Sequence, residues 1–357
     1  MIKTVLSAFR RLHQSRWWAL LIRPLLYLLL ALVVGRILLS LIGSVDWRQV
    51  GASLSQLSWS QAPLLIVLLI VRQAFNSIPL AVFVPGLGFS RAFQNDLTAN
   101  LVGTLAPPPG DVVVRISMFR SWKISPMDGM PGVTLNTLAF YVIRFGIPIV
   151  GIVFLIGEDL SRGQVWSAII SLVVAIAIVV TLILVSRGEG LARALGKQAA
   201  RITARFREGI DADVWADAVA KFRATMSARL MKGLPSSLAA LTVMVITDGL
   251  IVVLSLRYTG VNSSQLPLIF VLASFFIAYP LTALPLAGLG VLDAALVVTF
   301  TEVTGQAAES QIVAALVVWR VVTLIGALLL GALTFGWWHL QIRRGRLEAV
   351  TPAQEAV

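Results

Sequence analysis

The chain has 357 residues, of which 58% are hydrophobic and only 13% are charged, and its mean hydropathy is +0.88. Soluble domains carry roughly 25% charged residues, so this composition excludes a soluble globular protein and indicates an all-α polytopic membrane protein. The absence of cysteine excludes disulfides, iron–sulfur clusters and a thiol nucleophile. His13 and His339 lie near the two ends of the chain, so we expect no metal and no cofactor.

The net charge of +12 is concentrated in blocks that flank apolar segments. Residues 1–23 carry five basic residues and no acid, and residues 187–233 carry ten basic residues against five acids. The tail at 339–357 is also basic. This distribution is typical of the cytoplasmic side of a membrane protein. We therefore predict cytoplasmic N- and C-termini in the cell (inner) membrane, and no nucleic-acid partner.

Apolar segments of the length that a membrane helix needs recur along the chain. We predict six full spans within a single membrane domain covering residues 1–357. Residues 1–23 are expected to form a basic interfacial helix, residues 187–233 amphipathic helices along the cytoplasmic membrane surface, and residues 339–357 a cytoplasmic tail. The predicted spans are 24–42, 63–84, 131–156, 164–186, 234–257 and 311–338.

Two stretches rich in proline and glycine interrupt apolar segments, and each ends with an acid. The first break covers residues 104–111 and ends at Asp111, and the second covers residues 282–293 and ends at Asp293. Non-helical backbone persists at membrane depth only where protein buries it or water reaches it. Because the breaks lie in different halves of the chain, we predict two re-entrant, broken-helix hairpins related as an inverted repeat, with a binding site between them.

Polar side chains inside the predicted spans are the candidate site residues. A charge at the centre of a span costs roughly 2.5–3.5 kcal/mol, so such residues usually mark a site or a pathway. Arg36 lies late in its span and is interpreted as reaching out to the interface. The predicted substrate-binding residues are Arg72, Asn76, Asn100, Asp111, Arg115, Asn136, Arg144, Asp248, Asp293 and Arg320.

Three of these acids also have a structural interpretation, which the sequence leaves open. Asp248 could serve only as the ion-pair partner of an arginine. Asp111 and Asp293 could merely cap the helices that begin after the breaks, because carboxylates stabilise helix N-termini.

The balance of these charges predicts the ligand. If five arginines, Arg36 included, and three aspartates faced one cavity, an excess of two positive charges would remain. A buried charge without compensation is costly, whereas an anionic ligand would neutralise it. The planar fork of arginine suits phosphate oxygens, and helix N-termini after the breaks would favour the same anion. We therefore predict a cavity for a lipid with a phosphate head group.

Motifs for common catalytic chemistry are absent from the sequence. Gly86-Leu87-Gly88 does not continue into a Walker P-loop, and no Gly-x-Ser-x-Gly sequence occurs. Neither histidine lies near the breaks, so a Ser-His-Asp triad would have no base there.

The residues around the two breaks resemble the flippase-like membrane domain of lysylphosphatidylglycerol synthases and their stand-alone relatives. That family has an Asn, a Pro-rich break, a Gly-Glu pair and then an Arg, which is similar to Asn100, Pro107–Pro109, Gly110-Asp111 and Arg115 here. A second family motif, a Leu-Pro break followed by glycines and a Glu, is similar to residues 284–293, and Arg320 follows at a family-like distance. Both acids are Asp where the family mostly has Glu, and Ala287 replaces a usual glycine.

The resemblance covers about residues 24–338 and implies movement of a lipid between leaflets. The aminoacyl-transferring domain of the synthases would follow the last span, so we expect no lipid synthesis from this chain. The leading hypothesis is a transporter, not an enzyme, whose partners are the membrane and a phosphate-bearing lipid. One alternative is an enzyme acting on a polyprenyl- or glycolipid-phosphate, with Asp111 and Asp293 as acid and base. Another is a scaffold that recruits a cytoplasmic partner through residues 187–233. The sequence leaves open whether the chain forms a homo-oligomer.

Overall fold

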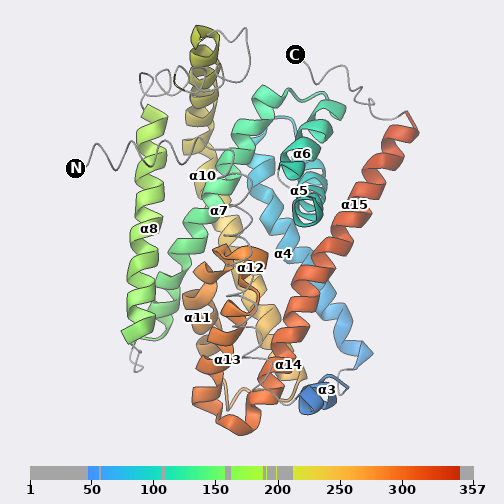
Figure 1. Ribbon diagram of the computed structural model, residues 1–357, viewed down its shortest axis with the longest axis vertical. Helices are drawn as coiled ribbons and strands as arrows, with labels where there is room; N and C mark the ends of the chain where they lie inside the picture. The colour runs from blue at the N-terminus through green and yellow to red at the C-terminus, as the bar shows by residue number, and fades with distance from the viewer. Residues whose placement is uncertain are drawn as a thin grey trace, which may run out of the picture.

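The computed structural model describes residues 47–55, 58–106, 109–156, 162–187 and 212–345, together with the single residues 190 and 198. Within these ranges the regular structure is helical (Figure 1). The first helices are α3 (Trp47–Ser55), α4 (Ala62–Phe83), α5 (Gly88–Leu105), α6 (Gly110–Ser121), α7 (Pro126–Phe154) and α8 (Arg162–Arg187). The later helices are α10 (Ala212–Tyr258), α11 (Leu268–Ala278), α12 (Pro285–Gly288), α13 (Val291–Thr304), α14 (Glu309–Arg320) and α15 (Gly326–Arg343). Short 3₁₀ turns are η2 (Trp59–Gln61), η3 (Tyr279–Ala283) and η4 (Gln306–Ala308), and η5 (Val321–Ile325) is π-helical.

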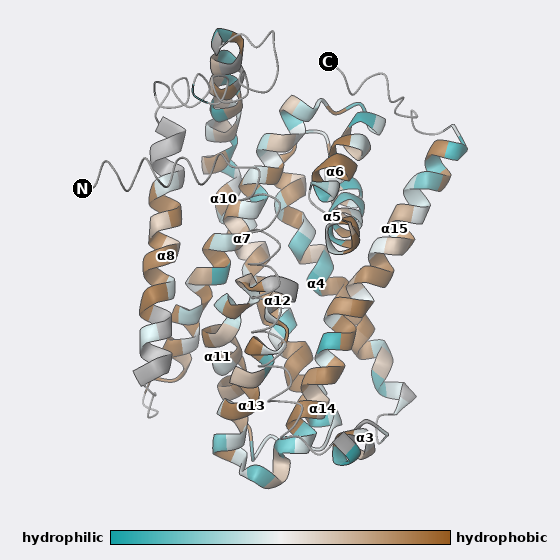
Figure 2. Cartoon of the chain, viewed as in Figure 1, coloured by the Kyte–Doolittle hydropathy of each residue, from teal (hydrophilic) through white to brown (hydrophobic). Residues whose placement is uncertain are grey.

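Four helical stretches are long and apolar enough to cross a membrane, and they make this a multi-pass membrane protein. They confirm the predicted spans 63–84, 131–156, 234–257 and 311–338. These stretches are Ala62–Phe83, Pro126–Phe154, Val219–Tyr258 and Gln306–Arg343. Hydrophobic residues predominate in the middle of the molecule and hydrophilic residues gather toward its two ends (Figure 2).

The remaining predicted segments have different outcomes. The span predicted at 164–186 coincides with the helix α8, whose described apolar part is Ile169–Thr181. The span predicted at 24–42 and the interfacial helix at 1–23 lie outside the described residues, as does most of the tail.

Most of residues 188–211 in the predicted surface segment lie outside the described residues, and the cytoplasmic placement of the segment stays a prediction. Residues 212–233 do not form a separate helix. These residues form one unbroken helix with the fifth predicted span, because α10 runs from Ala212 to Tyr258 over 47 residues. Pro235 lies inside this helix without ending it. The buried face of this part of α10 is formed by Ala216, Ala220 and Leu230, whereas Val214, one of the apolar residues that suggested a surface helix, is exposed.

The first predicted break separates α5 from α6, which pack against each other as a hairpin. Helix α5 ends at Leu105, and Ala106 takes an extended conformation (φ −107°, ψ 150°). A residue before a proline is disfavoured in the helical region, so Pro107 explains why the helix stops here. Helix α6 has only 12 residues, fewer than the roughly 20 that cross a membrane, as a broken-helix hairpin requires.

The second predicted break separates α11 from α13. Leu284 is extended before Pro285, and the short helix α12 leads into three residues with positive φ: Ala287 (55°), Gly288 (71°) and Gly290 (84°). Glycine occupies such conformations readily, whereas a side chain costs roughly 1–2 kcal/mol there. The chain therefore reverses on glycines, with Ala287 as the one strained position in this turn.

The two hairpins lie toward opposite ends of the molecule in Figure 1, with α5 and α6 in the upper part and α11 and α13 in the lower part. This is the arrangement that an inverted repeat produces. A large apolar cluster built around α10, α11, α13 and α14 surrounds the second hairpin, and a smaller cluster joins α5 and α6 to the end of α15. Each hairpin is thus anchored in a core of its own.

The last span is one continuous rod with a change of helical type inside it. Helix α14 ends at Arg320, η5 covers Val321–Ile325 as a π-helix, and α15 begins at Gly326. A single π-turn inside an α-helix is rare and frequently marks a functional site. The segment lies directly beside the polar cavity described next, which Thr323 and Leu324 line.

Candidate functional site

A polar cavity of about 490 Å³ lies in the middle of the molecule, between α4, α5, α6, α7 and the π-helical segment. We call it the central cavity. It brings together seven of the ten predicted site residues from four different helices: Arg72, Asn76, Asn100, Asp111, Arg115, Asn136 and Arg144. The other three, Asp248, Asp293 and Arg320, do not line it and are engaged in ion pairs. That the seven bind a substrate stays a prediction.

Arg115 is held by the facing arm of the first hairpin. Its guanidinium donates hydrogen bonds to Asn95 Oδ1 at 2.8 Å and to Asp96 Oδ1 at 2.9 Å. The amide of Asn76 on α4 donates to the other oxygen of the same carboxylate, Asp96 Oδ2, at 2.5 Å. These contacts connect α4, α5 and α6 through a single acid and fix the direction of the arginine in the cavity wall.

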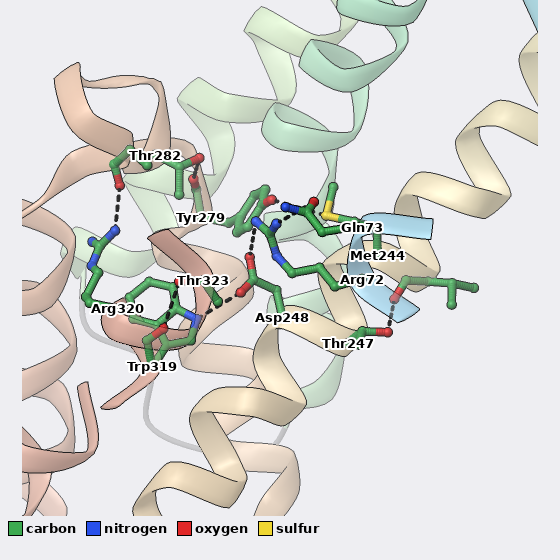
Figure 3. A network of polar contacts seen from close by, with 12 residues as sticks. Arg72, Gln73, Met244, Thr247, Asp248, Tyr279, Thr282, Trp319, Arg320 and Thr323 are labelled. Carbon is green, nitrogen blue, oxygen red and sulfur yellow. Dashed lines mark hydrogen bonds and ion pairs between the residues drawn. The ribbon is translucent and has the colours of Figure 1, made fainter. Parts of the chain in front are cut away.

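Arg72 is held from the second half of the chain. It donates to Asp248 Oδ2 on α10 at 3.0 Å and to its neighbour Gln73 at 3.2 Å. The second oxygen of Asp248 accepts a hydrogen bond from the indole N–H of Trp319 at 2.8 Å (Figure 3). Asp248 is only 3% exposed. Its carboxylate is therefore a buried counter-ion that joins α4, α10 and α14, in agreement with the structural interpretation of this residue.

Asp293 both caps a helix and binds an arginine. Its Oδ2 accepts the backbone N–H of Gly290 at 2.7 Å, at the start of α13. Arg320 donates to both carboxylate oxygens, at 2.7 Å to Oδ1 and 2.9 Å to Oδ2, and also to the carbonyl of Ala287 at 3.2 Å. This bidentate pair holds the second break against the last span, so the capping interpretation holds for Asp293.

Arg144 is the cavity arginine without a carboxylate partner among the described residues. Its guanidinium carbon lies 4.5 Å from the ring centroid of Phe140 and 5.2 Å from that of Tyr141. Its Nε is buried and has no hydrogen-bond partner. Two aromatic faces can hold a cation in place but leave its hydrogen-bond donors unused. A ligand in the central cavity could accept them.

Asp111 is the corresponding acid without a partner within the described part of the chain. It lies in the first turn of α6, where a carboxylate is favoured by the helix dipole. Pro109 occupies the N-cap position and has no side-chain hydrogen bond to the helix. Among the described residues Asp111 therefore interacts with the start of α6 through its charge, without a side-chain hydrogen bond, and its carboxylate lines the cavity.

The predicted charge balance included Arg36, which lies outside the described residues. Among the described residues Asp96 joins the site as an acid that was not predicted from the sequence. Four arginines (Arg72, Arg115, Arg144 and Arg320) therefore stand against four aspartates (Asp96, Asp111, Asp248 and Asp293). Three pairs are neutralised internally. The positive character of the site is local and comes from Arg144.

Asp96 and Trp319 were not predicted as site residues, although the sequence carries a signal for Asp96. Gln94, Asn95 and Asp96 form a polar run inside a helix between apolar stretches, and all three are buried. Buried polar groups need partners, so this run indicated a facing polar surface. The role of Trp319 carries no such signal, because an indole beside an arginine is equally common at a membrane interface.

A sequence model described as the lysylphosphatidylglycerol synthase TM region matches residues 25–331. The comparison with curated proteins found no match, and the comparison with solved structures found none either.

Proposed function

The chain belongs to the family of the lysylphosphatidylglycerol synthase TM region, since the match covers most of its length, and we propose that it moves a phosphate-bearing lipid between the leaflets of its membrane. The observation that carries this proposal is Arg144, which lines the central cavity without a carboxylate partner among the described residues. A phosphate oxygen would complete its hydrogen bonds and its charge.

In this proposal the paired arginines play a different part from Arg144. Arg72 and Arg115 are neutralised by Asp248 and Asp96, so they shape the cavity wall and offer remaining N–H groups without adding net charge. Asp111 would accept hydrogen bonds from hydroxyl or amine groups of the head group. The acyl chains would remain among the exposed apolar side chains of the outer helix faces.

We propose transport rather than an enzymatic reaction on a lipid phosphate. An acid–base pair needs two carboxylates within reach of the reacting atoms. Asp293, which the enzymatic alternative requires, is occupied by Arg320 and by the N–H of Gly290. Of these two acids only Asp111 lines the cavity, and the other acid in the lining, Asp96, is engaged by Arg115 and Asn76. By the positive-inside rule, the end that carries Arg343 and Arg344 would face the cytoplasm of the inner membrane.

A reconstitution experiment tests the proposal. Liposomes containing the protein and fluorescently labelled phosphatidylglycerol would be treated with an impermeant quencher, and the rate of lipid movement measured. We expect Arg144→Gln to slow movement by roughly ten-fold or more, because hydrogen bonds to charged groups contribute about 1.5–3 kcal/mol. Arg343→Gln, which changes an exposed arginine at the end of α15, is the matched control and should move lipid at the wild-type rate.

Two results would contradict the proposal. Equal rates for wild type and Arg144→Gln would exclude the cavity as the transport site. A lipid of altered mass after incubation would favour the enzymatic alternative, because transport returns the lipid chemically unchanged.

A further inference from the structure

A second cavity, of about 710 Å³, lies between the beginning of α5, the end of α6 and the last turns of α15. We call it the outer cavity. It contains one arginine and no acid among its lining residues, which are Ser90, Arg91, Phe93, Gln94, Trp122, Leu333, Thr334, Trp337 and Gln341. This set combines one positive charge, several neutral hydrogen-bonding groups and an apolar wall, which suits a molecule with an anionic head and an apolar body.

Arg91 provides the charge of the outer cavity. Its guanidinium lies 5.9 Å from the ring centroid of Trp122, and within the described ranges it has no carboxylate partner. Trp337 is 52% exposed on the opposite wall. Tryptophans with one apolar side and one polar edge are enriched at the level of lipid head groups. The basic residues Arg343 and Arg344 follow on the same helix, so this end attracts anionic lipid.

The outer and central cavities are separated by a short closed contact between α5 and α15. An added Cβ at Gly331 would lie 2.7 Å from the carbonyl oxygen of Leu97, so the two helices touch here through backbone. Beside this contact Thr334 makes two hydrogen bonds: its carbonyl accepts from Gln94 at 3.1 Å, and its hydroxyl lies 3.1 Å from that of Thr98. Leu97 lines the central cavity, while Gln94 and Thr334 line the outer cavity.

We infer that the outer cavity is a second binding site, for the head group of an anionic phospholipid from the leaflet at this end of the molecule. Arg91 contacts the phosphate there, and Phe93 and Leu333 contact the start of the acyl chains. The contact between Gly331 and Leu97 is the gate through which the head group passes along the α5–α15 seam into the central cavity. The gate, unlike the site, rests on the proposed function.

A binding measurement tests the site. The purified full chain in detergent would be titrated with phosphatidylglycerol, and the bound lipids counted by native mass spectrometry, with phosphatidylcholine as the comparison lipid. Arg91→Gln should weaken binding of one phosphatidylglycerol by about ten-fold and leave a second adduct, and Arg91→Lys should retain most of the affinity. In Arg144→Gln the adduct that depends on Arg91 should remain. Arg343→Gln is the matched control, since it removes an arginine at the same end that does not line the cavity.

If Arg91→Gln binds phosphatidylglycerol as tightly as wild type, or if phosphatidylcholine binds equally well, the outer cavity is not an anionic lipid site. Arg91 is exposed, so its replacement should leave the melting temperature unchanged. Melting measured without added lipid therefore separates a loss of folding from a loss of lipid binding.

A cross-link tests the gate. Because the chain has no cysteine, the double variant Thr98→Cys/Thr334→Cys places the only two thiols where the hydroxyls are 3.1 Å apart. Oxidation should stop lipid movement between leaflets while binding at the outer cavity persists, and reduction should restore movement. Movement at an equal rate in the oxidised and reduced states would overturn the gate. If wild type moves no lipid at all, the proposed function and the gate both fail, whereas the binding measurement still decides the outer site.

Discussion

Arg115 pairs with Asp96 across the first hairpin and not with Asp111, which lies four residues earlier on its own helix. A pair at this spacing within α6 would have stabilised that helix alone. The pair that forms instead connects α5 and α6, the two arms on either side of the first break. The two acids therefore have different roles. Asp96 holds the hairpin together, and Asp111 faces the cavity without a partner among the described residues.

These two roles predict different effects of the same chemical change, Asp to Asn, at the two positions. Asp96→Asn removes the counter-charge of the largely buried Arg115. We expect it to lower the free energy of unfolding by about 3 kcal/mol and therefore to lower the melting temperature. Asp111→Asn breaks no hydrogen bond and should leave the melting temperature near that of wild type while changing the rate of lipid movement. Melting of both proteins in the same detergent measures the difference, and equal melting temperatures would contradict the assignment.

The pair of Arg72 and Asp248 predicts strong coupling in a double-mutant cycle. Either Arg72→Gln or Asp248→Asn alone leaves one uncompensated charge between α4 and α10, at a cost of about 3–5 kcal/mol. The double variant removes both charges and should be more stable than the sum of the single changes predicts. Additive effects on the unfolding free energy would show that the two side chains do not interact in solution.

Ala287 predicts a stabilising substitution. Its φ of 55° lies in a region where a residue with a side chain is strained. Ala287→Gly should remove about 1 kcal/mol of backbone strain and thereby raise the melting temperature. Ala283→Gly is the matched control. Ala283 lies in an ordinary helical turn nearby, where glycine costs roughly 0.5–1 kcal/mol, so this variant should melt at a lower temperature. The same direction of change in both would refute the strain at Ala287.

Arg144→Lys separates charge from geometry in the central cavity. Lysine keeps the positive charge but cannot offer two parallel N–H groups to a phosphate. We expect lipid movement at a rate between those of wild type and Arg144→Gln, with an unchanged melting temperature, because Arg144 has no carboxylate partner among the described residues. A rate equal to that of wild type would mean that only the charge matters.

The sequence was sufficient for the features that depend on local chemistry. Pro107 and Pro285 each stop a helix because the preceding residue must be extended, and the apolar lengths of α4, α7, α10 and the last rod are those of membrane spans. A charged side chain that faces lipid is costly. Arg72, Arg115 and Arg144 were therefore expected to share one polar cavity. These arguments need no knowledge of which helix lies beside which.

The choice of partners could not be predicted in this way. Asp248 and Asp111 are both single acids among apolar residues. Asp248 is buried against an indole and an arginine, whereas Asp111 has no partner within the ranges that the structure describes. That difference arises from the packing of α10 against α4 and α14, between residues more than 70 positions apart. The continuation of α10 through residues 212–233 was missed for a related reason, since charged residues on one face do not end a helix whose other face is packed.

The π-helical segment determines how the side-chain faces of α14 and α15 are rotated relative to each other about the axis of the last span. One residue more per turn lets α14 direct Arg320 toward Asp293 while α15 presents Thr334 and Gly331 to α5. Because each residue of an α-helix turns the chain by about 100°, deleting a single residue within 321–325 would restore regular winding and rotate one of these surfaces away from its partner. The π-helical segment therefore allows one continuous helix to form both interfaces. Because both depend on it, the number of residues in this segment cannot change without the loss of one of them.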